Sequence, residues 1–304
     1  MQILIFLKLL YICLISISLF YSTLIHNENL PTQLSKNNIK KQMHCSINTI
    51  VCDLHGVLFI NNQPKFFIAK QIGLFSLLAY GLQFGKKMFY LKQMAFTILN
   101  KMKPSLDNES SALDPEAERL PLLMQEWLAG KRNGKDTIKL VHFLSDQHPE
   151  FFKSTIEKKL FLKIITIMFN PSIFVRMQTL HPDAPVFIKK LKKSGFKLYI
   201  LSNWDEQSFN ILKKKYKDFF ELFDGITISG DIGYNKPHSD AYYAFFEQHQ
   251  LNPLRCFFID DQAINVKAAA YCGMDGIVCP MKQKGVANLK HALSSIKNLS
   301  KESH

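Results

Sequence analysis

The chain has 304 residues, 47% of them hydrophobic, and a formal net charge of +13. This length suits one or two globular domains with a sizeable core, and the apolar content excludes a disordered chain. The positive charge lies mostly on lysine-rich amphipathic helices without a nucleic-acid-binding motif, so we expect no nucleic-acid partner. A field of this sign favours the approach of small anionic substrates.

Residues 1–42 are predicted to lie outside the catalytic fold. They contain an apolar run over residues 9–25, which is near the lower length limit of a membrane-spanning helix. Three interpretations stay open: a membrane anchor, a signal peptide, or a translation start at Met43. Lysines follow the apolar run, and this order favours a cytoplasmic location for the rest of the chain. We expect membrane contact only through residues 9–25.

The first predicted core strand ends in a carboxylate. The apolar run 50–52 is typical of a buried strand, and Asp53 follows it directly, with a glycine turn at Gly56. Open α/β sheets bind their ligands at the carboxyl ends of the strands. Asp53 is therefore a candidate nucleophile or metal ligand. The alternative is an ordinary turn that ends a strand.

Residues 62–180 are predicted to form an all-helical insertion. Apolar residues recur at helical spacing in five stretches, 66–84, 88–102, 120–128, 137–144 and 151–169. Prolines separate these stretches, and the polar residues 105–118 are predicted to be a loop. The many Phe and Met side chains favour the core of a helix bundle.

Beyond residue 180, short apolar strands alternate with amphipathic helices. The predicted strands are 197–202, 225–229, 256–260 and 276–279, and the predicted helices are 182–194, 205–216, 239–248 and 262–271. This alternation requires parallel strands joined by right-handed crossovers. We therefore expect an α/β fold with a doubly wound, Rossmann-like parallel sheet. Its core would comprise 43–61 and 181–304, with the helical cap inserted at 62–180.

The predicted strand 197–202 is followed and ended by small polar side chains, Ser202 and Asn203. A Ser hydroxyl and an Asn amide at this edge can hold a phosphate oxygen, whereas the alternative role is to cap the next helix. Asp205 is also a good capping residue, and we expect it to take that role. Ser202 would then be free for a ligand.

A lysine and a pair of acids complete the pattern. Lys236 precedes a proline, which biases it toward an extended loop. Asp260 and Asp261 end the strand 256–260, and adjacent carboxylates repel each other unless a cation neutralises them. The alternatives are a solvated lysine and an acidic pair that caps a helix.

Four motifs therefore occur in chain order: a strand followed by Asp53, a strand that ends at Ser202, a loop with Lys236, and a strand followed by the pair Asp260 and Asp261. A chain with these motifs in this order resembles the haloacid dehalogenase superfamily, in the subfamily with a helical cap inserted after the first strand. The resemblance covers roughly residues 47–285. It implies a Mg²⁺-dependent phosphohydrolase that forms an aspartyl-phosphate at its nucleophile and acts on a small phosphorylated substrate.

The resemblance also implies a role for each matching residue. The nucleophile would be Asp53. The phosphoryl group would contact Ser202, Asn203 and Lys236. The metal would bind Asp53, Asp260, Asp261 and the backbone carbonyl of residue 55.

One position departs from the pattern of the resembled family. His55 stands where its phosphatases usually carry a second Asp that acts as general acid and base. An imidazole can perform the same proton transfers, since its ordinary pKa is about 6.5. Two alternatives stay open, a haloacid-dehalogenase-like hydrolase without metal and a non-catalytic binding protein. The sequence names neither the substrate nor the oligomeric state.

Overall fold

The computed structural model describes residues 47–61, 90–102, 120–279, 281–282 and 286–301. The predictions made for 1–42, 66–84 and 105–118 lie outside these residues. Within the described ranges, no helix combines the length and the apolar character that a membrane crossing needs.

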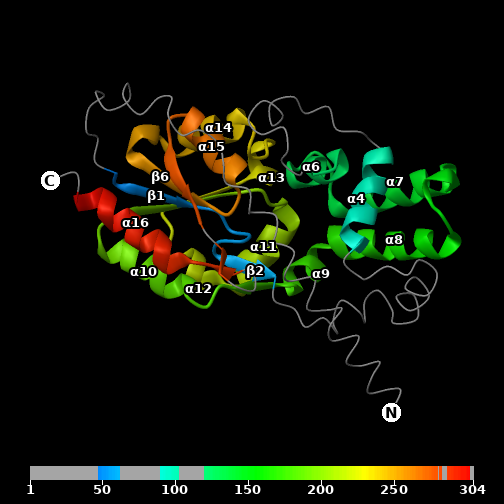
Figure 1. Ribbon diagram of the computed structural model, residues 1–304, viewed down its shortest axis with the longest axis horizontal. Coiled ribbons are helices and arrows are strands. Elements are labelled where there is room, and N and C mark those ends of the chain that lie inside the picture. Colours follow the sequence, from blue (N-terminus) through cyan, green and yellow to red (C-terminus); the bar gives the residue numbers. More distant parts are fainter. Residues whose placement is uncertain (1–46, 62–89, 103–119, 280, 283–285, 302–304) are drawn as a thin grey trace, which may run out of the picture.

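A five-stranded parallel sheet forms the centre of the fold (Figure 1). Its strands are β1 (Thr49–Cys52), β4 (Lys197–Ser202), β5 (Gly225–Ile228), β6 (Cys256–Asp260) and β7 (Asp275–Val278). Their order is β5-β4-β1-β6-β7, so the chain winds outward from β1 in one direction and then in the other. The predicted α/β, doubly wound fold is confirmed. The reversal at β1 makes the carboxyl ends of β4, β1 and β6 the expected ligand-binding edge.

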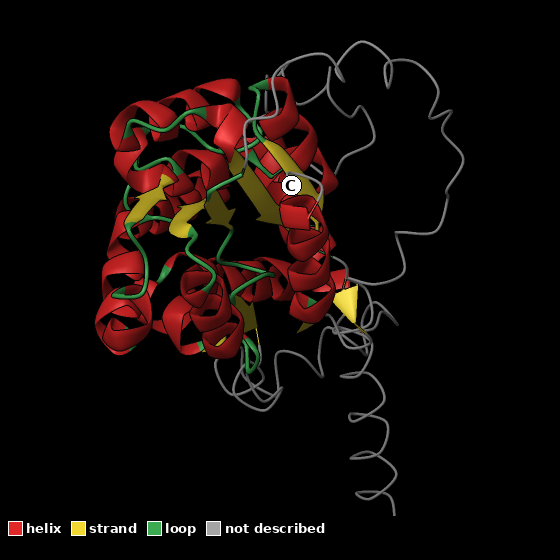
Figure 2. Cartoon of the chain, turned by 90° about the vertical axis from the view of Figure 1, so that its left-hand side faces the viewer, coloured by secondary structure: helices red, strands yellow, loops and turns green. Residues whose placement is uncertain are grey.

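The sheet lies between two layers of helices (Figure 2). Because alternate side chains of a strand point to opposite faces, Ile50 and Cys52 pack with one layer and Val51 packs with the other. The first layer comprises α10 (Ala184–Lys193), α11 (Glu206–Lys215), α12 (Lys217–Phe220) and α16 (Leu289–Lys301). The second comprises α14 (Ser239–His249) and α15 (Ala263–Tyr271). The sequence analysis did not predict α12 or α16.

A second hydrophobic core lies among helices that precede residue 178. These helices are α4 (Tyr90–Met102), α6 (Leu122–Leu128), α7 (Gly134–Gln147), α8 (Thr155–Phe169) and α9 (Pro171–Arg176). Side chains cap three of them, since Asn133, Ser154 and Asn170 each accept a hydrogen bond from a backbone N–H of the first turn. The caps explain why α7 begins before the predicted 137 and why α8 begins after the predicted 151.

A short antiparallel pair, β2 (Phe59–Asn61) and β3 (Gln178–Leu180), lies where the chain leaves the sheet and returns to it. Three-residue strands carry too little periodicity to be predicted, and neither strand was expected. The remaining elements are α13 (Ser229–Ile232), the 3₁₀ turns η1 (Pro149–Phe151) and η2 (Pro253–Arg255), and the pair β8 (Met281–Lys282) and β9 (Val286–Ala287).

Candidate active site

Three carboxylates meet at the carboxyl ends of β1 and β6. Asp53 directly follows β1, and its backbone N–H donates to the Ile259 carbonyl at 2.9 Å, which continues the strand pairing. Asp260 is the last residue of β6 and Asp261 follows it. One oxygen from each of the three carboxylates lies within 4.8 Å of the others. The neighbouring positions of β1 and β6 in the sheet bring these residues together.

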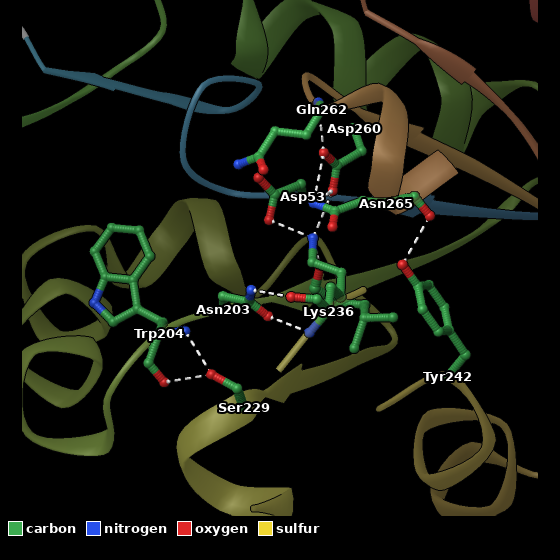
Figure 3. A network of polar contacts seen from close by, with 10 residues as sticks. Asp53, Asn203, Trp204, Ser229, Lys236, Tyr242, Asp260, Gln262 and Asn265 are labelled. Carbon is green, nitrogen blue, oxygen red and sulfur yellow. Dashed lines mark hydrogen bonds and ion pairs between the residues drawn. The ribbon is translucent and has the colours of Figure 1, made fainter. Parts of the chain in front are cut away.

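A buried lysine neutralises part of this charge (Figure 3). The Lys236 ammonium donates to Asp53 Oδ1 at 2.9 Å, to Asp260 Oδ2 at 2.6 Å and to the Leu201 carbonyl at 2.9 Å. Its side chain is 2% exposed, so water screens these ion pairs little. All three donor positions of the ammonium are therefore used, and the lysine bridges the strands β1, β4 and β6.

The carboxylates and the lysine shift each other's pKa values. Burial alone would lower the pKa of Lys236, but the charges of Asp260 and Asp53 outweigh it and raise that pKa, so the ammonium stays charged. Burial raises the pKa of Asp261 well above its ordinary value, and the neighbouring Asp260 and Asp53 raise it further. Burial also raises the pKa of Asp260, against the opposing charge of Lys236. Such a site favours a bound cation.

Residues that sequence reasoning missed hold Asp260 in place. Its Oδ1 accepts hydrogen bonds from the Gln262 backbone N–H at 2.8 Å and from the Asn265 amide at 3.0 Å. The Tyr242 hydroxyl donates to the Asn265 carbonyl at 2.7 Å, which ties α14 to the first turn of α15 (Figure 3). An Asn five residues after the acid, in the first helical turn, was the available sequence signal.

Two buried polar atoms of the site have no hydrogen-bond partner in the described part of the chain. They are the hydroxyl oxygen of Ser202 and Oδ1 of Asp261. A buried polar atom without a partner is costly, and such atoms are usually satisfied by a ligand, an ion or water. Asp205 caps α11 by accepting from the Ser208 N–H at 3.0 Å, as expected, and Ser202 remains free.

Asn203 contacts the main chain of Lys236 through both ends of its amide. Its Oδ1 accepts from the Lys236 N–H at 2.7 Å, and its Nδ2 donates to the Lys236 carbonyl at 2.8 Å. This pair of bonds fixes the loop that carries the lysine. Both polar atoms of the side chain are thereby engaged within the protein.

Gly56 allows the loop after β1 to approach Asp261 closely. Its φ is +87°, a conformation that residues with side chains rarely adopt, and a Cβ atom at this position would overlap the Asp261 carboxylate. The missing side chain thus makes room for the acid. The sequence showed a glycine after the strand but not what lies against it.

His55 is half-buried beside the carboxylates. Its ring centroid lies 6.4 Å from that of Trp204, and the rings are tilted by 60°. Burial lowers the pKa of His55, and the charge of Asp53 opposes this effect. The neutral imidazole is therefore favoured at neutral pH, in a position next to the candidate nucleophile.

The donor set fits a magnesium ion. Mg²⁺ prefers a few carboxylate oxygens together with waters and phosphate oxygens. Asp261 supplies a buried oxygen without a partner, and Asp53 supplies an oxygen that Lys236 does not engage. The three carboxylates exceed the single lysine charge that contacts them, so a cation would complete the neutralisation.

Comparison with known proteins agrees with the fold. The family of haloacid dehalogenase-like hydrolases matches residues 47–273, and the chain belongs to this family. The matched range contains the positions of Asp53, Ser202, Lys236, Asp260 and Asp261. The predicted superfamily is thereby confirmed.

Individual relatives are more distant. The chain is 32% identical over 100 residues to the sesquiterpene phosphatase astK of Aspergillus oryzae, and this match covers 32% of the chain and 50% of the relative. The chain thus spans about half the length of that curated relative. A HAD family enzyme of Bacteroides thetaiotaomicron superposes with a TM-score of 0.51 at 16% identity, over 82% of this chain and 98% of that one. A predicted hydrolase of Porphyromonas gingivalis, also like the haloacid dehalogenase (HAD) family, superposes with a TM-score of 0.48 at 17% identity. The superposition covers 83% of this chain and 98% of that one.

Proposed function

We propose that the protein hydrolyses a small phosphomonoester with the help of Mg²⁺, through an aspartyl-phosphate at Asp53. The observation that carries the proposal is the cluster of three carboxylates bridged by the buried ammonium of Lys236. Phosphoryl transfer depends mainly on positioning and on neutralising the charge of the phosphoryl oxygens. A lysine and a cation site next to one candidate nucleophile meet both requirements.

Each residue has a proposed task in this reaction. Asp53 attacks phosphorus with one carboxylate oxygen, and the bond from phosphorus to the leaving oxygen breaks as that oxygen takes up a proton. The Ser202 hydroxyl donates to a phosphoryl oxygen, and Lys236 offsets the developing charge. Asn203 orients Lys236 through its backbone. The oxygens of Asp53, Asp260 and Asp261 and the carbonyl of residue 55 hold Mg²⁺, which when bound supplies further positive charge to the phosphoryl group.

His55 is proposed as the proton shuttle. In the first step the imidazolium protonates the leaving oxygen, and in the second the neutral imidazole takes a proton from the attacking water. The proximity of the half-buried ring to the nucleophile supports both steps, and its lowered pKa supports the second step, which uses the neutral imidazole. The proposal further treats 43–61 and 181–304 as the catalytic core, placed in the cytoplasm, and 62–180 as the cap that selects the substrate.

A panel of phosphorylated metabolites tests the proposal. The panel should include an isoprenoid phosphate, because the related Aspergillus oryzae protein is a sesquiterpene phosphatase. We expect phosphate release with Mg²⁺ and none after chelation, and the same loss in the Asp260→Asn/Asp261→Asn double variant. A chelated protein that releases halide from a 2-haloacid would favour the metal-free dehalogenase instead. Mg²⁺ binding without turnover of any compound would favour the non-catalytic alternative.

A further inference from the structure

The end of α6 contacts the loop that carries Lys236. The Asn235 side-chain amide donates from Nδ2 to the Gln125 carbonyl of α6 at 2.8 Å, although 110 residues separate the two in sequence. The buried Oδ1 of the same amide has no hydrogen-bond partner in the described part of the chain. The bond to α6 therefore fixes the orientation of this amide. The next residue is Lys236, so the contact with α6 lies directly beside the lysine whose ammonium bridges the carboxylates.

A second hydrogen bond reaches α6 at its last residue. The Ser229 hydroxyl donates to the Leu128 carbonyl at 2.7 Å and accepts from the Trp204 N–H at 2.9 Å (Figure 3). Carbonyls at the end of a helix lack partners within the helix, and this hydroxyl supplies one. Trp204 directly follows Asn203, which bonds to the Lys236 backbone. The Ser229 hydroxyl therefore connects α6 to the other residue that holds this loop.

Two glycines allow this close approach. Gly130, just past α6, has a φ of +68°, and a Cβ atom there would lie 2.5 Å from the Gly230 carbonyl oxygen of α13. A Cβ atom on Gly230 would itself lie 2.7 Å from the Glu206 backbone nitrogen. The end of α6 and α13 therefore meet backbone to backbone, with no room for a side chain (Figure 1).

The packing of α6 links these contacts to the helices that precede residue 178. Leu123, Trp127 and Leu128 of α6 are buried in the second hydrophobic core rather than against the sheet. A shift of this core relative to the sheet would carry the α6 carbonyls with it, because packed helices move as units. The hydrogen bonds that Asn235 and Ser229 donate to those carbonyls would then break.

We propose that Asn235 is a positioning residue that makes the place of Lys236 depend on where α6 lies. With α6 in contact, the amide holds the loop so that the ammonium reaches Asp53 and Asp260. With α6 displaced, the amide loses its partner and the ammonium no longer keeps one position between the carboxylates. A substrate that holds the proposed cap against the sheet would thus complete the phosphoryl site. The kinetic consequence rests on the proposed phosphatase activity, whereas the structural consequence does not.

Steady-state kinetics of Asn235 variants test the kinetic consequence. Asn235→Ala removes the donor, and the nearly isosteric Asn235→Asp places a carboxylate oxygen against the Gln125 carbonyl. We expect kcat to fall about tenfold in the alanine variant and further in the aspartate variant, with KM changed by less than about threefold. The control is Asn252→Ala, because this exposed asparagine also loses one hydrogen bond, from the Leu254 N–H, and should keep wild-type kcat. Wild-type kcat in both folded Asn235 variants would overturn the proposal.

Gly130→Ala disturbs the same contact from the side of α6. The added Cβ would overlap the Gly230 carbonyl and push α6 away from α13, whereas Gly195→Ala has a similar positive φ and open space around its Cβ. Gly130→Ala should therefore lower kcat and Gly195→Ala should not. If both changes act through one contact, Gly130→Ala with Asn235→Ala should lose no more than about threefold beyond the stronger single variant. Losses that multiply in the double variant would contradict the proposal.

Magnetic resonance of isotope-labelled lysine nitrogens reports the place of Lys236 without any substrate. The ammonium is buried and donates three hydrogen bonds, so its protons should exchange slowly and give a separate signal, identified by its absence in Lys236→Met. The signal should shift or broaden in Asn235→Asp and Gly130→Ala and stay unchanged in Asn252→Ala. An unchanged signal in the two folded variants would overturn the proposal even if the wild type hydrolyses phosphomonoesters. The expected shift in a protein that hydrolyses nothing would support the positioning role and contradict only the proposed function.

Discussion

The side-chain amide of Asn203 forms two hydrogen bonds with the backbone of Lys236. Its Oδ1 accepts from the Lys236 N–H, and its Nδ2 donates to the Lys236 carbonyl. The lysine side chain continues from there to Asp53 and Asp260. An asparagine that directly follows β4 therefore helps to determine where the ammonium of a loop distant in sequence lies. The sequence had suggested Asn203 as a phosphate ligand, whereas the geometry gives it a main-chain partner.

Asn203→Ala should lower kcat by about tenfold or more and leave KM for substrate nearly unchanged. Two hydrogen bonds are lost, each worth about 0.5–1.5 kcal/mol, and the ammonium becomes less well oriented for the transition state. Steady-state kinetics of the alanine variant measure this split. Asn203→Asp, which keeps the acceptor but loses the donor, should fall between the alanine variant and the wild type. A rise in KM, with weaker inhibition by inorganic phosphate and unchanged kcat, would instead indicate a direct phosphate ligand.

Asp53→Asn should abolish turnover, with a loss of at least about 10³-fold, because the amide keeps the shape of the side chain but not its nucleophilicity. The variant also removes one of the two charges that hold Lys236. Phosphate release and circular dichroism are measured on the same preparation. A folded Asn variant with near-normal activity would exclude Asp53 as the nucleophile.

Gly56→Ala should weaken both activity and the response to Mg²⁺. The new Cβ would overlap the Asp261 carboxylate, and the positive φ adds backbone strain on the order of 1 kcal/mol. Gly195→Ala is the matched control, since φ is +85° there and nothing lies within 4 Å of the added Cβ. Both variants should lose stability in thermal melts, but only Gly56→Ala should require more Mg²⁺ for half-maximal activity. Equal Mg²⁺ requirements would show that the contact with Asp261 is unimportant.

His55→Ala should slow turnover by about 10²–10⁴-fold, the usual share of acid–base catalysis, with little change in Mg²⁺ affinity. Because burial lowers the pKa of His55, the acidic limb of the pH–rate profile should lie below the ordinary value of about 6.5. Where hydrolysis of the aspartyl-phosphate limits turnover, the rate should fall as the pH drops through that limb, since protonation consumes the neutral imidazole that this step uses. His55→Asp should retain activity and move the limb to lower pH. An unaltered rate and an unaltered pH–rate profile in the alanine variant would show that His55 takes no part in proton transfer.

His249 should make folding stability depend on pH. It lies against Tyr199 and Phe245, and burial lowers the pKa of its imidazole. Its contribution to the free energy of unfolding is complete above the unfolded pKa of about 6.5 and is lost as the pH falls through the lower folded value. Urea unfolding at several pH values should show a smaller decrease on acidification in His249→Gln than in the wild type. Identical pH dependence of the two proteins would contradict this.

The sequence by itself determined the sheet and the set of acidic and basic residues at its edge. The apolar runs 50–52 and 256–259 are buried strands, as their β-branched and aromatic content predicts, and alternation with amphipathic helices permits few arrangements other than a parallel sheet. A carboxylate directly after such a strand must lie at the carboxyl edge. The positions of Asp53, Asp260 and Asp261 therefore followed from local periodicity.

The tertiary structure alone decided how these groups contact one another. Lys236 is far in sequence from Asp53, and only the packing of β4 between β1 and β5 brings its loop over the acids. The hydrogen bonds between Asn203 and Lys236, and the close contact between Gly56 and Asp261, each join two loops that are separate in sequence and lie within a few ångströms of each other. Such contacts leave no periodic pattern in the chain, because they arise from three-dimensional packing rather than from local backbone preference.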